Sequence, residues 1–358
     1  MTMSRMTTNK GHRRYRSLAA MIATASVLAL SACASGGAGD AGDGDAPNTE
    51  LPEITINLGH VVSETEPTNI ALESVAEAVS ERTDGRLTIE LFPNGQLGQN
   101  RDMQEQTLTG AAQIAQIDPG YAAELSGNTE LNIMGGPFLF DTVEDVNTLL
   151  DSDLVAAWND QLADESGVHM LTWKFYFGER HIIANDGYPE PADLDGVKIR
   201  VPPNPSWIET FEALPTSPTV LEWSEVYTGL QQGVIDAAEA PLATMKASSL
   251  QEVGDTVTLT GHFKAITGWW TSVEFWDSLP AEYQKILTEE FAAGAEVMTE
   301  MTIGLEDELR AEFEDDLGVT LVEPDIEAYK AAAEPFYDAF PEWGDGLYEQ
   351  VLDILNAS

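Results

Sequence analysis

Residues 54–95 read ITINLGHVVSETEPTNIALESVAEAVSERTDGRLTIELFPNG and contain two strand patterns separated by a helix pattern. Residues 54–61 alternate apolar and polar side chains, which predicts a β-strand. Pro67 suits the first turn of a helix, and the apolar residues after it recur on one helical face until Asp84-Gly85 ends the pattern. Residues 87–92 predict a second strand. This order indicates an α/β fold with a mainly parallel sheet.

The pattern continues on both sides of a long apolar stretch, VHMLTWKFYF at 168–177, which predicts a strand that runs through a core. Residues 280–313 predict one long helix, interrupted mainly at Gly294 and Gly304. The other expected elements are helices near 101–108, 143–163, 205–214 and 225–232 (the last between Ser224 as N-cap and Gly233 as C-terminal cap), and strands at 113–117, 180–185, 197–201 and 217–221.

We therefore expect two βα lobes around a cleft, joined by extended strands, with the long helix spanning both lobes. Lobe I would comprise residues 53–177 and 266–305, and lobe II residues 178–265 and 306–350. Such an architecture supports a binding cleft but does not by itself name a ligand.

The composition excludes several classes of function. The 358 residues include 17 Lys+Arg against 61 Asp+Glu, a formal net charge of −44. Nucleic acid is not an expected partner, because its binding requires a surplus of basic residues. The single cysteine excludes an internal disulfide framework and a Cys-rich metal site. Such acidity suggests a salt-rich habitat, where dense surface carboxylates stay hydrated and their repulsion is screened.

The first 52 residues predict export and a membrane anchor. Residues 1–33 hold five basic residues and no acid, so the rest of the chain carries 12 basic against 61 acidic residues, a net charge of −49. The apolar run at 18–30 is too short to span a bilayer, which needs about 20 residues. It ends in LSAC at 30–33, which resembles the bacterial lipobox, in which the cysteine is lipidated.

We therefore expect residues 1–32 to be a lipoprotein signal peptide and Cys33 to be the lipidated N-terminus of a protein held on the outer face of the cell membrane. The alternative is an ordinary secretory signal with an incidental cysteine. Residues 33–52 predict an acidic flexible linker, and their aspartates lack the spacing of a calcium loop.

Seven stretches of the remaining chain, taken together and in order, resemble the solute-binding proteins of tripartite ATP-independent periplasmic (TRAP) transporters of the DctP type. They are LGHVVS (58–63), RTDGRLTIE (82–90), FPNGQLG (92–98), PFLF (137–140), LDGVKIRVP (194–202), SEVYTGLQ (224–231) and FWDSLP (275–280). The resemblance implies a periplasmic-binding-protein-like receptor that closes around a small organic acid and delivers it to TRAP membrane subunits for uptake driven by an ion gradient. It implies no enzymatic activity, catalytic residue, metal or cofactor.

The resemblance also implies binding residues. In the family, the arginine of a K-[IL]-R-V-P strand holds the substrate carboxylate by two bonds, and here that residue is Arg200. A planar guanidinium matches the two oxygens of a carboxylate. Arg180, in GERHIIAN at 178–185, would contact the acid further, or form a salt bridge with a neighbouring acid such as Glu179. Trp223 stands where the family has an aromatic residue beside the ligand, and the alternative for it is a core position.

Trp269 and Trp270 are expected on one strand and therefore on opposite faces, one toward the cleft and one toward the core. Trp173 lies in the strand that leads to the second lobe, where either a cleft or a core position is open. The family's D-G-Q-E-N-P segment reads DAAEAP at 236–241, so Ala240 replaces a substrate-binding Asn. This loss predicts a more apolar or aromatic ligand than a sugar acid. Glu239 would hold local loop amides or meet a ligand cation, in which case a zwitterion such as ectoine becomes reasonable.

Three other functions compete with this interpretation. A receptor for an ABC importer would share the anchor and the two lobes but lack the K-I-R-V-P and S-E-V-Y signatures. An acidic surface hydrolase would use paired carboxylates, none of which the spacing singles out. A purely structural lipoprotein would bind no small molecule. The chain has no P-loop, H-E-x-x-H or G-x-S-x-G motif.

Overall fold

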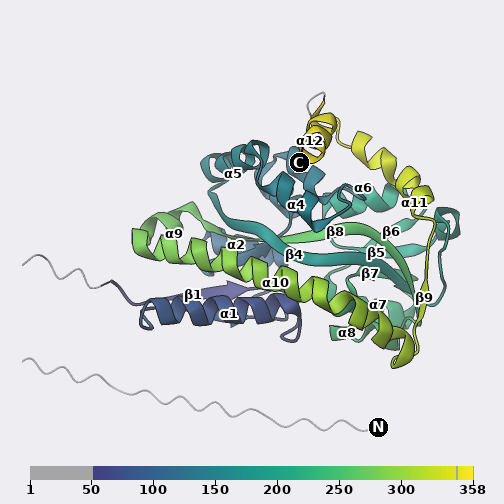
Figure 1. The fold of residues 1–358 in the computed structure, drawn as a ribbon, viewed down its shortest axis with the longest axis horizontal. Coiled ribbons are helices and arrows are strands. Elements are labelled where there is room, and N and C mark those ends of the chain that lie inside the picture. Colours follow the sequence, from purple (N-terminus) through teal and green to yellow (C-terminus); the bar gives the residue numbers. More distant parts are fainter. Residues whose placement is uncertain (1–50, 344–345, 358) are drawn as a thin grey trace, which may run out of the picture. The chain divides into compact units, whose positions relative to one another are not determined.

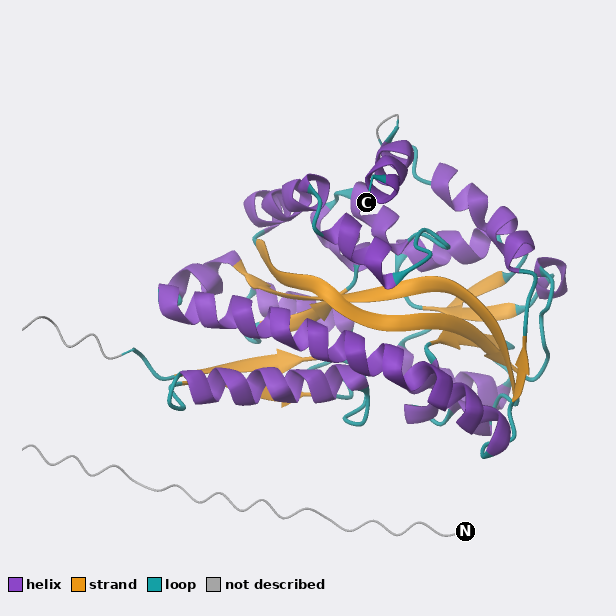
Figure 2. Ribbon diagram, in the orientation of Figure 1, coloured by secondary structure: helices purple, strands orange, loops and turns teal. Residues whose placement is uncertain are grey.

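One mixed β-sheet organises the computed structural model, which describes residues 51–343 and 346–357. Nine strands pair in this part of the chain, and two long ones connect the two ends of the sheet (Figure 2). Their spatial order is β2 (Leu87–Phe92), β1 (Ile54–Gly59), β3 (Ile114–Ile117), β8 (Thr256–Ser272), β4 (Val168–Ala184), β7 (Ala237–Ala240), β5 (Lys198–Val201) and β6 (Ser217–Val220), with β9 (Thr320–Val322) beside β8. The outer pairs β1–β2, β1–β3, β5–β6 and β5–β7 are parallel, as the βα pattern predicts.

The long strands β4 and β8 run antiparallel to each other and have 17 residues each. The sequence predicts two separate strands, at 168–177 and 180–185, where β4 is continuous. Gly178 has φ of 114°, and the pairing with β8 shifts register on both sides of it. These irregularities bend the strand without ending it.

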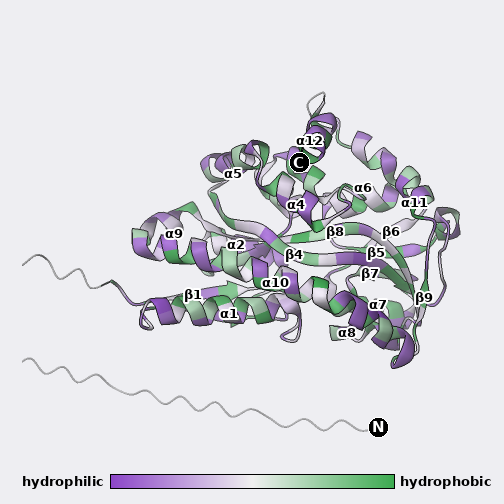
Figure 3. Ribbon diagram, viewed as in Figure 1, coloured by the Kyte–Doolittle hydropathy of each residue, from purple (hydrophilic) through white to green (hydrophobic). Residues whose placement is uncertain are grey.

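Helices cover the sheet (Figure 1), and most of the predicted ones are confirmed. The helices at predicted positions are α1 (Pro67–Arg82), α2 (Asn100–Leu108), α4 (Val143–Leu150), α5 (Asp153–Ser166), α6 (Pro205–Ala213), α7 (Val226–Gln232) and α10 (Ala281–Asp315). Those that the sequence analysis did not predict are α3 (Pro119–Ser126), α8 (Leu242–Ala247), α9 (Val273–Ser278), α11 (Ile326–Ala333) and α12 (Leu347–Asn356). Hydrophobic and hydrophilic residues alternate along them, as expected for helices with one buried face (Figure 3).

Two predicted helix boundaries are wrong. The helix expected over 143–163 is two helices, because Ser152 accepts a hydrogen bond from the Val155 amide and so starts α5. Ser224 does not cap α7, because residues Trp223–Glu225 form a 3₁₀ turn that leads into it. Gly233 ends α7 in the left-handed conformation, with φ of 70°, as predicted.

The predicted long helix is confirmed as α10, which has 35 residues and no break at Gly294 or Gly304. At 1.5 Å per residue it is about 50 Å long. Its first half packs on α1 and β4, with Phe291 in a core shared with β1 and β2. Its second half places Phe313 in a separate core, shared with α7, α8 and β7. One helix therefore connects the cores at the two ends of the sheet (Figure 1).

Four buried clusters form the core, two toward each end of the sheet. The C-terminal helix α12 packs against α4, and its Leu347 joins the cluster of α3, α4 and α5 at the β3 end. The predicted boundary, which assigns residues up to 350 to lobe II, differs from this packing. The lipobox, Cys33 and almost all of the expected linker lie outside the described residues. None of the described helices is long and apolar enough to cross a membrane.

Candidate ligand-binding site

A cavity of about 80 Å³ lies between the two ends of the sheet, beside the middle of β4 and β8. A single water takes about 10–15 Å³ of such a cavity, so the space suits a small molecule. Its walls combine four aromatic residues and two arginines with amide, hydroxyl and carboxyl groups. The lining residues are Val61, Val62, Asn100, Gln116, Asp118, Tyr121, Phe177, Arg180, Arg200, Pro202, Trp207, Trp223, Thr244, Ala265, Ile266 and Thr267.

Arg200 reaches this cavity from β5 and is only 3% exposed. Its Nε donates to the Leu221 carbonyl at 2.9 Å, and its guanidinium carbon lies 5.3 Å from the centre of the Trp223 ring. No described acidic side chain forms an ion pair with it. Burial lowers the pKa of Arg200 to about 10, so the group remains protonated at neutral pH. Arg200 is a buried cation that lacks a paired anion among the described residues.

Arg180, from β4, lines the same cavity but already has a partner. Its Nε and Nη2 donate to the Glu239 carboxylate, with Nη2 at 2.8 Å from Oε1, and Nη2 also donates to the Glu239 carbonyl at 3.0 Å. The Trp207 indole donates to the same carboxylate at 3.1 Å, and His262 Nε2 lies 3.4 Å from it. Burial opposes ionisation of Glu239, but Arg180 lowers the pKa of that carboxyl to about 2.

Glu239 is therefore ionised and fully enclosed, with 0% of its surface exposed, and it does not line the cavity. Neither role expected for it, a bond to loop amides or to a ligand cation, describes this geometry. Glu239 orients Arg180 and balances its charge. Ala240, which follows it in β7, pairs with His181 of β4 and also lies outside the cavity.

The tryptophans separate into two groups. Trp223 lines the cavity, whereas Trp173, Trp269 and Trp270 are buried away from it. Trp269 and Trp270 do face opposite sides of β8, as expected, but the expectation that one faces the cleft needs correction. Trp269 packs with β1, α1 and α10, and Trp270 packs with α3, α4 and α5. At this end of β8 helices cover both faces of the sheet, so both faces are core.

Residues 58–342 match the model of the bacterial extracellular solute-binding protein family 7, DctP. The chain belongs to the DctP family. It is 30% identical to the ectoine-binding periplasmic protein TeaA of Halomonas elongata over 75% of this chain and 80% of that one. It is also 30% identical to a solute-binding protein of Roseobacter denitrificans over 79% of this chain and 85% of that one.

Solved structures of TRAP periplasmic solute-binding proteins share the two-lobed fold. The protein of Actinobacillus succinogenes with bound L-galactonate has a TM-score of 0.82 and 28% identity, over 85% of this chain and 100% of that one. The protein of Fusobacterium nucleatum with bound sn-glycerol-3-phosphate has a TM-score of 0.80 and 32% identity, over 85% and 97%. This DctP protein is thus a TRAP solute receptor. The proteins of this family are extracytoplasmic receptors that work with TRAP membrane subunits, and the family is not a class of enzymes.

Sequence reasoning missed several residues that line the cavity of this DctP protein. Asp118 and Tyr121 follow the carboxyl end of β3, and Asn100 begins α2. Trp207 lies in α6, just after the strand that carries Arg200. A usable signal was present, since ligands of open α/β sheets bind beyond the carboxyl ends of the strands.

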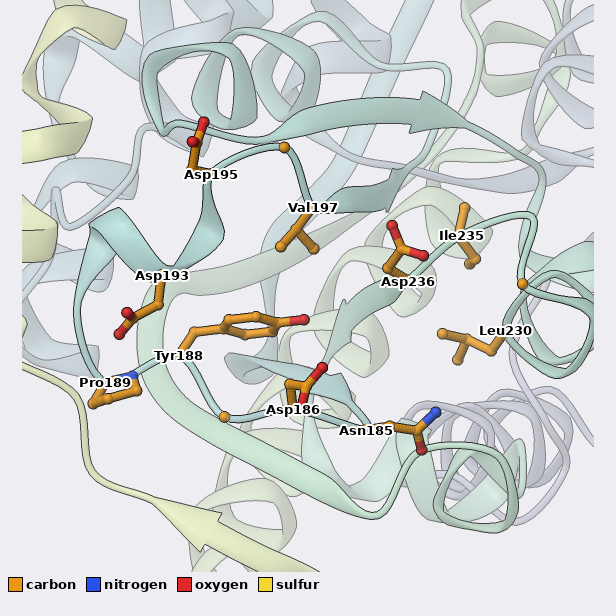
Figure 4. A pocket seen from close by; sticks show the side chains of 13 residues that line it. Asn185, Asp186, Tyr188, Pro189, Asp193, Asp195, Val197, Leu230, Ile235 and Asp236 are labelled. Atoms are coloured by element: carbon orange, nitrogen blue, oxygen red, sulfur yellow. The ribbon is translucent and has the colours of Figure 1, made fainter.

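A larger hollow in the DctP protein, of about 700 Å³, is lined mainly by loops around Tyr188 and is shown in Figure 4. Its charged lining residues are all acidic: Asp186, Asp193, Asp195 and Asp236. It offers no lysine or arginine to a carboxylate, and no metal-binding group of His, Cys, Asp and Glu occurs among the described residues. The cavity around Arg200 is therefore the better candidate.

Proposed function

We propose that this receptor binds a small organic carboxylate, with Arg200 as the residue that holds the carboxylate. The observation that carries the proposal is the buried guanidinium without an ionic partner. An uncompensated buried charge costs several kcal/mol, and a bound carboxylate would remove that cost. The guanidinium and a carboxylate can form two parallel hydrogen bonds.

The other walls favour a compact, partly apolar ligand. Phe177, Trp207 and Trp223 supply aromatic surface, and the cavity is small. Two relatives are named for ectoine, the second being the ectoine/5-hydroxyectoine-binding periplasmic protein UehA of Ruegeria pomeroyi. Ectoine is therefore the first compound to test, with the sugar acid L-galactonate as the contrasting one.

Binding would be followed by closure of the two lobes and transfer to the TRAP membrane subunits. Three hydrogen bonds already connect the β1–β3 side with the β5–β7 side and support such closure. Asn204 Nδ2 donates to Asp118 Oδ1 at 2.5 Å, Arg101 Nη2 to the Pro203 carbonyl at 3.1 Å, and Thr244 Oγ1 to Glu66 Oε2 at 2.6 Å.

The test is a thermal-shift screen of small carboxylates on the protein and on Arg200→Ala. A ligand at 100 times its Kd stabilises the folded parent by about 2.7 kcal/mol, and we expect Arg200→Ala to lose this stabilisation. The control is Arg82→Ala, which removes an exposed arginine that pairs with Glu289 and Glu290 on α10. An unchanged shift in Arg200→Ala would place the carboxylate elsewhere. Any turnover of the bound compound would favour the hydrolase alternative.

We also propose that the receptor is exported and anchored by a lipid on Cys33, on the evidence of the LSAC motif at 30–33. The acidic chain that follows would then connect the anchor to the folded part. Cys33→Ala should move the protein from the membrane fraction to the soluble extract and abolish incorporation of radiolabelled palmitate. Retention of the label in Cys33→Ala would contradict the assignment of Cys33.

A further inference from the structure

We propose that the solute carries a positive charge as well as its carboxylate, and that Asp118, which also lines the cavity, binds the positive group. This inference rests on the proposed function and narrows the ligand to a zwitterion.

The charges around the cavity are the first argument. Two arginines and two carboxylates meet here, Arg200 and Arg180 with Glu239 and Asp118. Burial lowers the pKa of His262, so we count this residue as neutral. The sum is zero before a ligand binds. A ligand with one carboxylate and no cation would leave an uncompensated negative charge in a closed space, whereas a zwitterion keeps the sum at zero.

A further buried acid lies just outside the cavity wall. Glu66 is 2% exposed and accepts the hydrogen bond from Thr244, whose side chain lines the cavity. Burial raises the pKa of Glu66, which opposes its ionisation, and any ionised fraction adds negative potential at the same place. It therefore strengthens the argument against a lone carboxylate and against a dianion.

The geometry of Asp118 provides the second argument. The Tyr121 amide and the Asn204 side chain both donate to its Oδ1, at 3.1 and 2.5 Å, and the Gly120 amide also donates to the carboxylate. A carboxylate has about four acceptor sites, so Asp118 can accept from a further donor. Tyr121 is 2% exposed and lines the cavity, and its pKa responds to Asp118 and to Arg200. Arg200 reaches the cavity from β5 and Asp118 from the start of α3, so the cavity offers a cation and an anion on different elements.

Two further polar groups of the cavity lining, on Tyr121 and Asn100, can also accept hydrogen bonds. The Tyr121 hydroxyl and Asn100 Oδ1 are both buried and make no hydrogen bond of normal geometry in the described part of the chain, and the two side chains interact with each other. Asn100 Oδ1 can only accept, and an ionised Asp118 can only accept. Buried acceptors need donors, and an ammonium or amidinium group supplies several N–H donors in one place.

Asp118 also begins α3 as its N-cap, and this structural role needs a separate explanation. Asn caps a helix as well as Asp does, so capping does not require the charge. Asp118→Asn therefore removes the charge and keeps the cap. A matched control is Asp325→Asn, at the exposed N-cap of α11, where Asp325 accepts from the Ala328 amide.

The experiment measures Kd by calorimetry at pH 7.5 for four compounds on the full folded protein. Ectoine and piperidine-3-carboxylate carry both charges, cyclohexanecarboxylate has the same ring size without the cation, and L-galactonate replaces the cation with hydroxyls. We expect the parent to bind at least one zwitterion 10-fold or more tightly than both anions. Asp118→Asn should weaken that zwitterion 10-fold or more and leave cyclohexanecarboxylate unchanged or tighter. Asp325→Asn should change none of these values.

Three results would overturn the inference. In the first, the parent binds cyclohexanecarboxylate or L-galactonate as tightly as the zwitterions or more tightly. In the second, Asp118→Asn loses the same affinity for every compound. In the third, the parent binds none of the four compounds. Arg200→Ala separates the two proposals. If Arg200→Ala still binds the zwitterion while Asp118→Asn does not, the assignment of the ligand carboxylate to Arg200 fails and the role of Asp118 stands. If anions bind and need Arg200, the proposed function stands and the zwitterion inference fails.

Discussion

Glu239 determines how the site is held together at the scale of single residues. Its carboxylate accepts hydrogen bonds from Arg180 and Trp207, contacts His262 Nε2, and is fully buried. Glu239→Gln should therefore lower the free energy of unfolding by about 3–5 kcal/mol, because it leaves the Arg180 charge buried without an ionic partner. Urea unfolding measures the loss. Glu289→Gln, which breaks an exposed ion pair with Arg82, should lower the free energy of unfolding far less, and similar losses in the two variants would contradict this role.

Asp118 has the opposite relation to stability. Burial raises its pKa from 3.8 to about 6 in the folded protein, so the folded state binds the proton more tightly than the unfolded state does. Stability from this group is complete below the unfolded pKa and is lost as the pH rises through about 6. Asp118→Asn should thus be more stable than the parent by about 1–3 kcal/mol above pH 6.

The difference between Asp118→Asn and the parent should shrink as the pH falls toward 4, and urea unfolding across this range measures it. Asp325→Asn is the control at an exposed cap. A constant difference at all pH values would mean that the substitution acts through packing or capping and not through the buried charge.

At the scale of elements, the contact between α1 and α10 depends on one small residue. A Cβ at Gly294 would lie 2.3 Å from Val75 Cγ2, whereas a Cβ at Gly304 in the same helix would meet nothing within 4 Å. Gly294→Ala should therefore cost about 1–3 kcal/mol through overpacking. Gly304→Ala should gain about 0.5–1 kcal/mol, because alanine favours the helix. Thermal unfolding of both variants tests the pair, and equal effects would contradict the packing argument.

The elements were predictable where local chemistry determines them. Pro67 at the start of α1 and Gly233 at the end of α7 are examples, since each acts through its own backbone conformation. The continuity of β4 through Gly178 was not predictable, because the pairing with β8 is made by residues about 85 positions away. Arg200 and Trp223 could be placed from motifs in single segments. Asp118 could not, because its role depends on which strand ends meet at the cavity.

The same limit explains the misplaced tryptophans. Alternation along β8 correctly predicts that Trp269 and Trp270 face opposite sides. Whether a side is cleft or core depends on which helices cover it, and α1, α10 and α3–α5 come from distant parts of the chain. Strand periodicity therefore gives the direction of a side chain but not its surroundings.

At the scale of the whole molecule, the charge opposes the proposed ligand. After Cys33 the chain carries a net charge of −49, while the binding site offers only two arginines, one of them neutralised. In dilute buffer, where the Debye length reaches about 30 Å at 0.01 M salt, the field of the whole protein extends well beyond the surface. This field repels an anion and also destabilises the folded state through self-repulsion.

At 1 M salt the Debye length falls to about 3 Å, so only groups in contact with the ligand still act on it. We therefore expect the thermal midpoint to rise between 0.05 and 2 M NaCl, and the Kd of a lone carboxylate such as cyclohexanecarboxylate to fall or stay constant. A zwitterion, which has no net charge, should show a smaller change of Kd. Sucrose at equal osmolality is the control, since it favours the compact state by exclusion but screens no charge. A carboxylate that binds more weakly at 2 M than at 0.05 M would show that direct pairing with Arg200 outweighs the field of the surrounding acids.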